Sequence, residues 1–161
     1  MNSENTIKNL QDALSMELTA CHQYQLHASV LDDWGLDRLA SQMREEMTEE
    51  LGHSDEFISR ILFLNGTPEL ALQKTPVLAK GLKEMFELDL ADEKEAIEFY
   101  TSAAREASDN GDIGSRTIFE KIVLDEEGHM GWLELQLNLL ERMGEPAYIS
   151  KHMSAPSEDG A

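Results

Sequence analysis

Apolar residues recur every three or four positions over four long stretches of the chain, a spacing that predicts amphipathic helices. The expected helices cover Ser3–Trp34, Leu36–Leu64, Leu82–Ser108 and Asp112–Met143. A glycine follows closely on the end of each stretch, and all four prolines lie outside the stretches, as expected for helix boundaries. No segment of useful length alternates as a strand would. The pattern therefore predicts an all-α fold.

The lengths of the connections predict how the four helices are arranged. Tight turns join the first helix to the second and the third to the fourth, so each pair should be antiparallel. The connection between the pairs, residues 65–81, is long enough to run the length of the bundle. We expect a four-helix bundle with one long crossover and a short fifth C-terminal helix at Ala147–His152. The folded domain then covers residues 1–153, and residues 154–161 form a disordered acidic tail.

Composition excludes several classes of function. The 161 residues include 13 Lys and Arg against 32 Asp and Glu, a net charge of −19 that argues against nucleic-acid binding. The longest apolar run, Ile61–Leu64, is too short to span a membrane, and Met1–Asn5 has neither part of a secretion signal. A single cysteine, Cys21, excludes an internal disulfide, and we expect a cytoplasmic protein. The acidic excess either aids solubility or attracts small cations, and the charge alone leaves both readings open.

A glutamate interrupts each apolar helix face near its middle. These glutamates are Glu17, Glu50, Glu93 and Glu126. The second and the fourth are each followed three positions later by a histidine, and a helix turns such pairs to the same face. The histidines are His53 and His129. One Glu-x-x-His pair is common on a solvated helix, whereas two pairs in matching positions indicate a shared site.

The two halves of the chain repeat around these residues. The spacing from the first glutamate to the second equals the spacing from the third to the fourth. When the halves are aligned on the glutamates, Tyr24 falls on Tyr100 and His53 falls on His129. We name this correspondence the internal repeat. It predicts two related helical hairpins with pseudo-twofold symmetry through the glutamates.

Burying these six side chains together requires counter-charges. Four carboxylates in a dry cavity repel one another, and the loss of hydration raises their pKa values. Two divalent cations remove the conflict, because four negative charges balance two doubly positive ions while the imidazoles bind neutral. Carboxylate and imidazole ligands suit iron, manganese or zinc. The pattern predicts a dinuclear metal site of the kind built into the core of ferritin-like di-iron bundles.

At these residues the sequence resembles bacterioferritin, a ferritin-like di-iron family, from about Leu10 to Tyr148. The likeness is carried by Gln23-Tyr24, Asp33–Leu36, Arg60–Leu64, Asp89–Glu93, Asp125–His129 and Trp132–Glu134. It implies an iron-storage protein and ferroxidase that oxidises Fe(II) to Fe(III) with O2 or peroxide (H2O2). The mineral would be held inside a 24-subunit homo-oligomeric shell, towards which the acidic charge would draw Fe(II).

The resemblance also implies a role for each candidate residue. Two iron ions per subunit would be held by Glu17, Glu50, His53, Glu93, Glu126 and His129. Glu50 and Glu126 would bridge the two ions. Aromatic residues near the site would either supply electrons or pack in the core: Tyr24, Tyr100 and Trp132. Three further histidines show no partner pattern and are expected at the surface or in packing: His22, His27 and His152.

One residue departs from the family pattern. Bacterioferritins typically carry a methionine directly after the bridging glutamate of the second helix, where two copies ligate a haem between subunits. Here that residue is Leu51, which has no donor atom for iron. We therefore expect no haem in the homopolymer, although Met47 lies one turn earlier on a similar face. The chain could also be a haem-free component of a shell mixed with a haem-binding, methionine-bearing subunit.

Two other functions remain open from the sequence. A peroxidase of rubrerythrin type would use a similar site, but it usually has an attached iron centre with paired CxxC motifs, and one cysteine argues against that. A structural subunit that only co-assembles into a shell is the second alternative, and the complete set of six ligand residues argues against it. The ligand types alone do not choose between iron, manganese and zinc.

Overall fold

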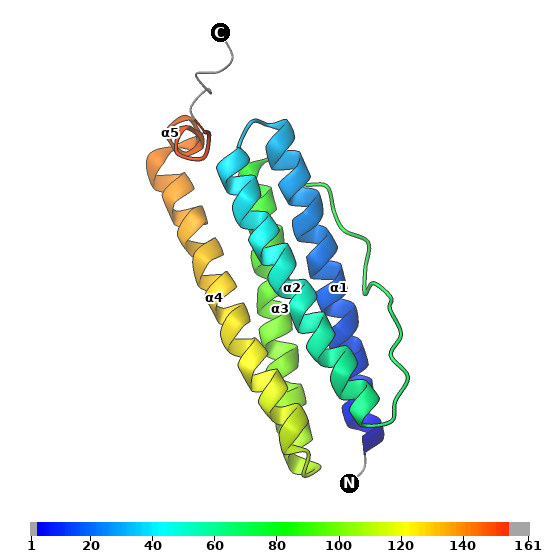
Figure 1. The fold of residues 1–161 in the computed structure, drawn as a ribbon. Coiled ribbons are helices and arrows are strands. Elements are labelled where there is room, and N and C mark those ends of the chain that lie inside the picture. The colour runs from blue at the N-terminus through cyan, green and yellow to red at the C-terminus, as the bar shows by residue number, and fades with distance from the viewer. Residues whose placement is uncertain (1–2, 155–161) are drawn as a thin grey trace.

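The computed structural model describes residues 3–154, and within this range it contains helices and no strand (Figure 1). The helices are α1 (Ser3–Asp33), α2 (Asp37–Phe63), α3 (Leu82–Asp109), α4 (Ile113–Met143) and the short α5 (Glu145–Ser150). The predicted all-α bundle is confirmed, and each long helix begins and ends within one residue of its expected bounds.

The short helix α5 begins two residues before its predicted start. Pro146 lies in its first turn, where the missing N–H of proline leaves no helical hydrogen bond unmade. The sequence prediction took this proline only as the end of the preceding helix. Of the predicted acidic tail, Ser154 donates hydrogen bonds to Asp37, and residues 155–161 lie outside the described residues.

The helices form two antiparallel hairpins, α1 with α2 and α3 with α4 (Figure 1). The crossover, residues 64–81, runs along the outside of the bundle from the end of α2 to the start of α3. Two glutamines of α1 hold it through both ends of their amides. Gln11 donates to the carbonyl of Glu69 at 2.6 Å and accepts from its N–H at 3.0 Å. Gln23 does the same with Val77 at 2.9 and 2.8 Å.

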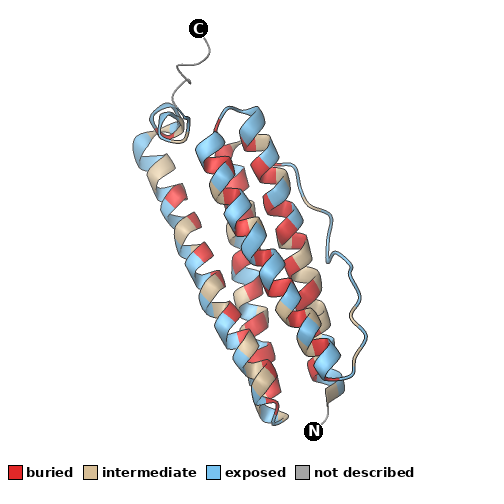
Figure 2. Ribbon diagram, viewed as in Figure 1, coloured by how far each residue is buried: buried red, intermediate tan, exposed pale blue. Residues whose placement is uncertain are grey.

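The apolar core is divided into two clusters along the bundle. One cluster lies towards α5 and includes Leu31, Met43 and Phe86. The other lies towards the opposite end and is built from residues such as Phe57 and Phe119. The buried positions follow the inward face of every long helix (Figure 2). The middle of the bundle, between the two clusters, is where the predicted glutamates fall.

A buried polar network fixes the end of the bundle where α3 turns into α4. Asp112 precedes α4 and accepts hydrogen bonds from the N–H of Ser115 at 2.9 Å and from its hydroxyl at 2.7 Å. Arg60, in the last turn of α2, donates to Asp112 Oδ1 at 2.5 Å and to Ser115 Oγ at 2.9 Å. One side chain therefore caps α4 and also joins it to the neighbouring hairpin.

Replacing Asp112 with alanine should lower the free energy of unfolding by about 3 kcal/mol. The variant loses a helix cap, which contributes about 1 kcal/mol, and leaves the half-buried guanidinium of Arg60 without its carboxylate. Chemical denaturation measures the change. The matched control is Asp109→Ala, an exposed aspartate just before the same turn, which should change stability by less than about 0.5 kcal/mol. Equal effects of the two substitutions would contradict the role assigned to the network.

Candidate metal centre

The four predicted glutamates meet in the middle of the bundle. Each comes from a different long helix, and none has more than 3% of its surface exposed. His53 on α2 and His129 on α4 join them and are 3% and 5% exposed. All six side chains predicted from the sequence therefore converge on one interior region. They form two groups, which we name the Glu17 position (Glu17, Glu50, His53, Glu126) and the Glu93 position (Glu50, Glu93, Glu126, His129).

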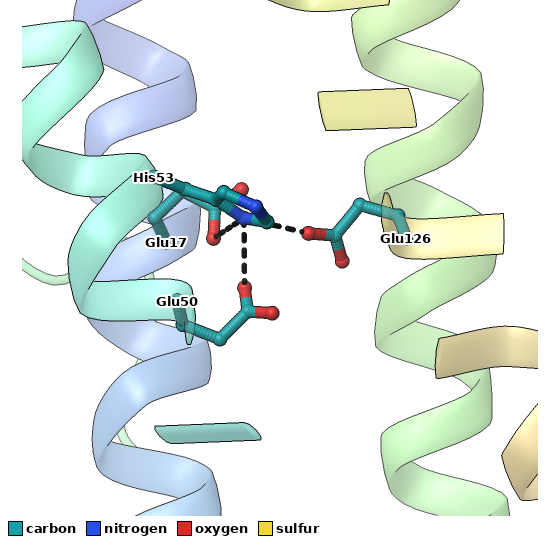
Figure 3. A group of neighbouring side chains, drawn as sticks. All are labelled: Glu17, Glu50, His53 and Glu126. Atoms are coloured by element: carbon teal, nitrogen blue, oxygen red, sulfur yellow. Dashed lines mark ion pairs between the residues drawn. The ribbon is translucent and has the colours of Figure 1, made fainter. Parts of the chain in front are cut away.

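The Glu17 position is organised around Nδ1 of His53 (Figure 3). This nitrogen lies 3.0 Å from Glu126 Oε1, 3.5 Å from Glu17 Oε2 and 4.0 Å from Glu50 Oε2. Three helices contribute to the group, because Glu17 projects from α1, Glu126 from α4, and the other two side chains from successive turns of α2.

The Glu93 position repeats this arrangement around Nδ1 of His129. That nitrogen lies 3.0 Å from Glu50 Oε1, 3.4 Å from Glu93 Oε1 and 3.7 Å from Glu126 Oε2. Glu50 and Glu126 thus turn one carboxylate oxygen towards each histidine. This division of oxygens is the geometry that a carboxylate bridging two cations requires.

Each of the six residues also has one buried atom without a hydrogen-bond partner. Within residues 3–154 the side-chain atoms in this condition belong to these six residues and to two others, Thr6 and Glu46. The six atoms are Glu17 Oε2, Glu50 Oε1, His53 Nδ1, Glu93 Oε2, Glu126 Oε1 and His129 Nδ1. Buried polar atoms are nearly always paired, so unpaired oxygens and nitrogens facing one another indicate a missing electron-pair acceptor. Divalent cations fit this donor set.

A small cavity opens beside these atoms between α1 and α3. Its volume is about 30 Å³, and its walls include Glu17, Glu50, Glu93 and Glu126. This is room for about two water-sized species. Two residues of the crossover, Gln73 and Lys74, also line this cavity.

Carboxylates outside the six also contact the far nitrogens of the histidines. Asp125 Oδ2 lies 3.0 Å from His53 Nε2, and Glu49 Oε2 lies 2.7 Å from His129 Nε2. Such contacts hold the proton on Nε2, leave Nδ1 free as a ligand atom and make the imidazole a stronger donor. Neither residue was predicted as part of the site from the sequence, although the internal repeat pairs Glu49 with Asp125 and could have revealed them.

Two tyrosines related by the internal repeat bind the two glutamates that are not shared between positions. Tyr24 donates to Glu93 Oε1 at 2.5 Å, and Tyr100 donates to Glu17 Oε1 at 2.7 Å. Burial, reinforced by the neighbouring carboxylates, raises the pKa of both phenols well above their ordinary value, so they remain donors. Trp132, by contrast, packs edge-on against Phe86 in the apolar cluster near α5.

The other histidines differ in their surroundings. His22 is exposed, and His152 packs against the ring of Tyr148 at 4.3 Å, as expected for surface and packing residues. His27, however, is fully buried and has a charged neighbour that the sequence did not suggest, with Nδ1 lying 3.0 Å from Asp89 Oδ2.

Without a bound cation, the glutamates and histidines of the two metal positions balance their charges by holding protons. Burial, followed by the charges of Glu17 and Glu126, raises the pKa of Glu50 well above its ordinary value. Burial likewise raises the pKa of Glu93, with Glu126 adding to the shift. Burial opposes a charge on His53, but the nearby carboxylates of Glu126 and Glu17 outweigh burial and raise its pKa to about 11. A cation that binds here must displace these protons.

Binding of Zn(II) should therefore release protons and weaken as the pH falls. Groups whose pKa is raised hold their protons at neutral pH, so lowering the pH from 8 to 6 increases the competition between protons and the metal ion. We expect release of more than one proton per bound ion, measured with a pH indicator in weak buffer. The affinity, measured by competition with a chelating dye, should fall over the same range. A pH-independent affinity without proton release would contradict this description.

A four-helix bundle with one long crossover and two facing Glu-x-x-His pairs in its core defines the ferritin-like class of dinuclear carboxylate proteins. None of the helices over residues 3–154 has the length and apolar character that a membrane-spanning segment needs.

Comparison with known proteins agrees with this class and narrows it. The family model for the ferritin-like domain matches residues 7–143. The bacterioferritin of Rhodobacter capsulatus is 44% identical to this chain over 138 residues, which cover 86% of each chain. The bacterioferritin of Brucella melitensis is 40% identical over 153 residues, which cover 95% of this chain and 94% of the relative. The chain belongs to the bacterioferritin family.

Solved structures extend the likeness to three dimensions. The Rhodobacter capsulatus bacterioferritin superposes with a TM-score of 0.91 at 41% identity over 96% of both chains, and it is described as having a metal-free dinuclear site and a haem iron. The Mycobacterium tuberculosis bacterioferritin gives a TM-score of 0.92 at 34% identity, covering 96% of this chain and 97% of the other.

Proposed function

We propose that this chain is an iron-storage subunit that oxidises Fe(II) at the two positions in its core. The observation that carries the proposal is the division of the Glu50 and Glu126 oxygens between His53 and His129. Two ions held side by side by the same two carboxylates can each give one electron to a single molecule of O2 or H2O2. The proposed ligands are Glu17, Glu50, His53, Glu93, Glu126 and His129.

The protein's own residues would bind and orient Fe(II) as the substrate. Four carboxylates balance two divalent ions, and Asp125 and Glu49 keep His53 and His129 aligned through their Nε2 atoms. Tyr24 and Tyr100 fix the outer glutamates by hydrogen bonds. The apolar clusters on either side exclude water and prevent the carboxylates from turning outward.

At the level of the assembly, we propose a shell of 24 copies that stores oxidised iron inside. The likeness to bacterioferritins over almost the whole chain and the net charge of −19 support this proposal, because an acidic protein attracts Fe(II). We also propose that the protein acts in the cytoplasm and that residues 1–153 form its folded domain.

Replacing Glu50 with glutamine should slow Fe(II) oxidation by about a hundredfold or more. The substitution removes a ligand from both positions, and losing even an outer hydrogen-bond partner of a metal ligand costs about 10- to 100-fold. Stopped-flow absorbance after mixing Fe(II) with the aerobic assembly measures the rate. Glu127→Gln, which changes an exposed glutamate next to Glu126, is the matched control and should react like the unmodified protein. A Glu50→Gln variant that retains the full rate would refute the proposed site.

The same preparation separates iron storage from the two alternatives. Iron storage predicts that repeated Fe(II) additions accumulate as mineral inside a large shell. A small dimer that turns over peroxide without retaining iron would instead identify a rubrerythrin-like peroxidase. A silent homopolymer would identify a subunit with a co-assembling role only.

We further propose that a shell of this chain alone lacks haem. Bacterioferritins typically use a methionine where this chain has Leu51, and Leu51 is 50% exposed on α2, outside the buried core. Met47, one turn earlier, is half-buried and packs against the apolar cluster near α5. A haem would then enter only through a partner subunit that carries the methionine.

Replacing Leu51 with methionine should create haem binding that the unmodified chain does not have. Two thioethers facing each other across a subunit pair supply the axial ligands that leucine lacks. Spectra recorded after incubation with haem should show a new Soret band with a stoichiometry of one haem per two subunits. Leu51→Ala is the control for added space alone and should bind none. A stoichiometric Soret band from the unmodified homopolymer would overturn the proposal.

A further inference from the structure

The internal repeat that relates the two metal positions is broken by three buried polar residues, all of them beside the Glu93 position. Asp89, His27 and Glu46 are 2%, 0% and 6% exposed. The internal repeat pairs them with Ala13, Ala103 and Ile122, which are also buried. The Glu17 position therefore has apolar side chains where the Glu93 position has two carboxylates and an imidazole.

Asp89 and His27 join α3 to α1 immediately next to the Glu93 position. Asp89 precedes Glu93 by one turn of α3, and His27 follows Tyr24 by one turn of α1. Both Asp89 oxygens lie 3.0 Å from His27 Nδ1. Asp89 also lines the cavity that the four glutamates of the site share.

Hydrogen bonding fixes which side chain of this pair is the donor. The N–H of Val77 donates to Gln23 Oε1, so the amide NH2 of Gln23 is the end that faces His27 Nε2, at 2.9 Å. His27 Nε2 must then accept a hydrogen bond and carries no proton. The proton is on Nδ1, where it is donated to Asp89. Asp89 is thus the acceptor in this pair, and although burial raises the pKa of its carboxyl to about 6, the group is ionised at neutral pH.

Glu46 adds a second carboxylate to the same half. Its Oε2 lies 2.7 Å from His129 Nε2, beside Glu49, which is also 2.7 Å from that nitrogen. His53, the equivalent of His129, has only Asp125 in this role among the described residues, because Ile122 takes the place of Glu46. Glu49 makes the hydrogen bond to His129 Nε2 and Glu46 Oε2 makes none, so Glu46 adds a carboxylate beside this imidazole without a second hydrogen bond.

We propose that the two metal positions are not equivalent and that the Glu93 position binds a divalent cation more tightly, because Asp89 and Glu46 add buried negative charge to that half alone. Two additional carboxylates near a doubly charged ion in a region of low dielectric correspond to a difference in affinity of at least about tenfold. The inference rests on the proposed dinuclear site and adds to it the order in which cations occupy the two positions. Asp89 and Glu46 act as positioning and charge-setting residues.

Zinc provides the test, because it binds the same ligand types without redox chemistry. Crystals of the assembled protein are equilibrated with half an equivalent of Zn(II) per subunit, and anomalous scattering on both sides of the zinc absorption edge gives the occupancy of each position. We expect at least about ten times more zinc at the Glu93 position than at the Glu17 position.

Two variants test the cause of the difference. Asp89→Asn combined with Glu46→Gln removes both charges but keeps side chains of the same shape. His27→Ala combined with Asp89→Ala copies the residues that the other half of the bundle already tolerates. The first should make the two occupancies nearly equal, and the second should reduce their ratio. The matched control, Glu45→Gln with Glu127→Gln, removes two exposed charges and should leave the ratio unchanged.

The possible outcomes separate the unequal affinity, its cause and the dinuclear site itself. Equal occupancy in the unmodified protein, or a preference for the Glu17 position, overturns the inference and leaves the dinuclear site standing. A ratio that persists in the Asp89→Asn, Glu46→Gln variant overturns the role of the two charges. Zinc at neither position contradicts both the inference and the proposed function.

Discussion

The mutual repulsion of four carboxylates held out of water is the constraint on which the rest of this structure depends. An uncompensated ion in a protein interior costs several kcal/mol, and this bundle places four potential anions within one polar layer. The surrounding residues reduce that cost in stages. Two imidazoles face the carboxylates, two tyrosines donate to the outer pair, and further acidic residues hold the imidazoles from behind. What is left over are unpaired atoms directed at one another, which divalent cations would satisfy.

The architecture follows from the need to hold this layer in place. A layer of polar side chains across the middle of a bundle needs apolar packing above and below it. The core is therefore divided into two clusters, with Phe86 in one and Phe57 in the other. The two hairpins present similar faces, so a twofold-related pair of positions arises from one repeated pattern. The crossover lies outside this core and is held by the amides of Gln11 and Gln23. The amide of Gln23 also contacts Nε2 of His27, whose Nδ1 lies against Asp89, and this chain of contacts links the crossover to the site.

The sequence predicted the helices and the six converging residues for the same physical reason. Helical periodicity places residues on faces, and charged residues on an apolar face must meet one another or a counter-ion. The internal repeat made the pattern specific, and it also contained the Glu49 and Asp125 pair that was overlooked. The internal repeat could not reveal Asp89, His27 and Glu46, because these residues break it. Their contacts join different helices and depend on the packing angle between them, which periodicity does not define. The start of α5 was misplaced because Pro146 was taken as a helix end, whereas α4 already ends at Met143, with Gly144 as its cap, and Pro146 lies in the first turn of α5.

The central claim is that two divalent ions bind side by side in the core of each subunit. Anaerobic titration of the assembled protein with Fe(II), followed by near-infrared magnetic circular dichroism, tests it most directly, because the signal reports Fe(II) in a protein ligand field. The account predicts a signal that stops rising at two Fe(II) per subunit and that is lost when Glu50 and Glu126 are both replaced by glutamine. A signal that rises without a break, or that survives this double substitution, would contradict it.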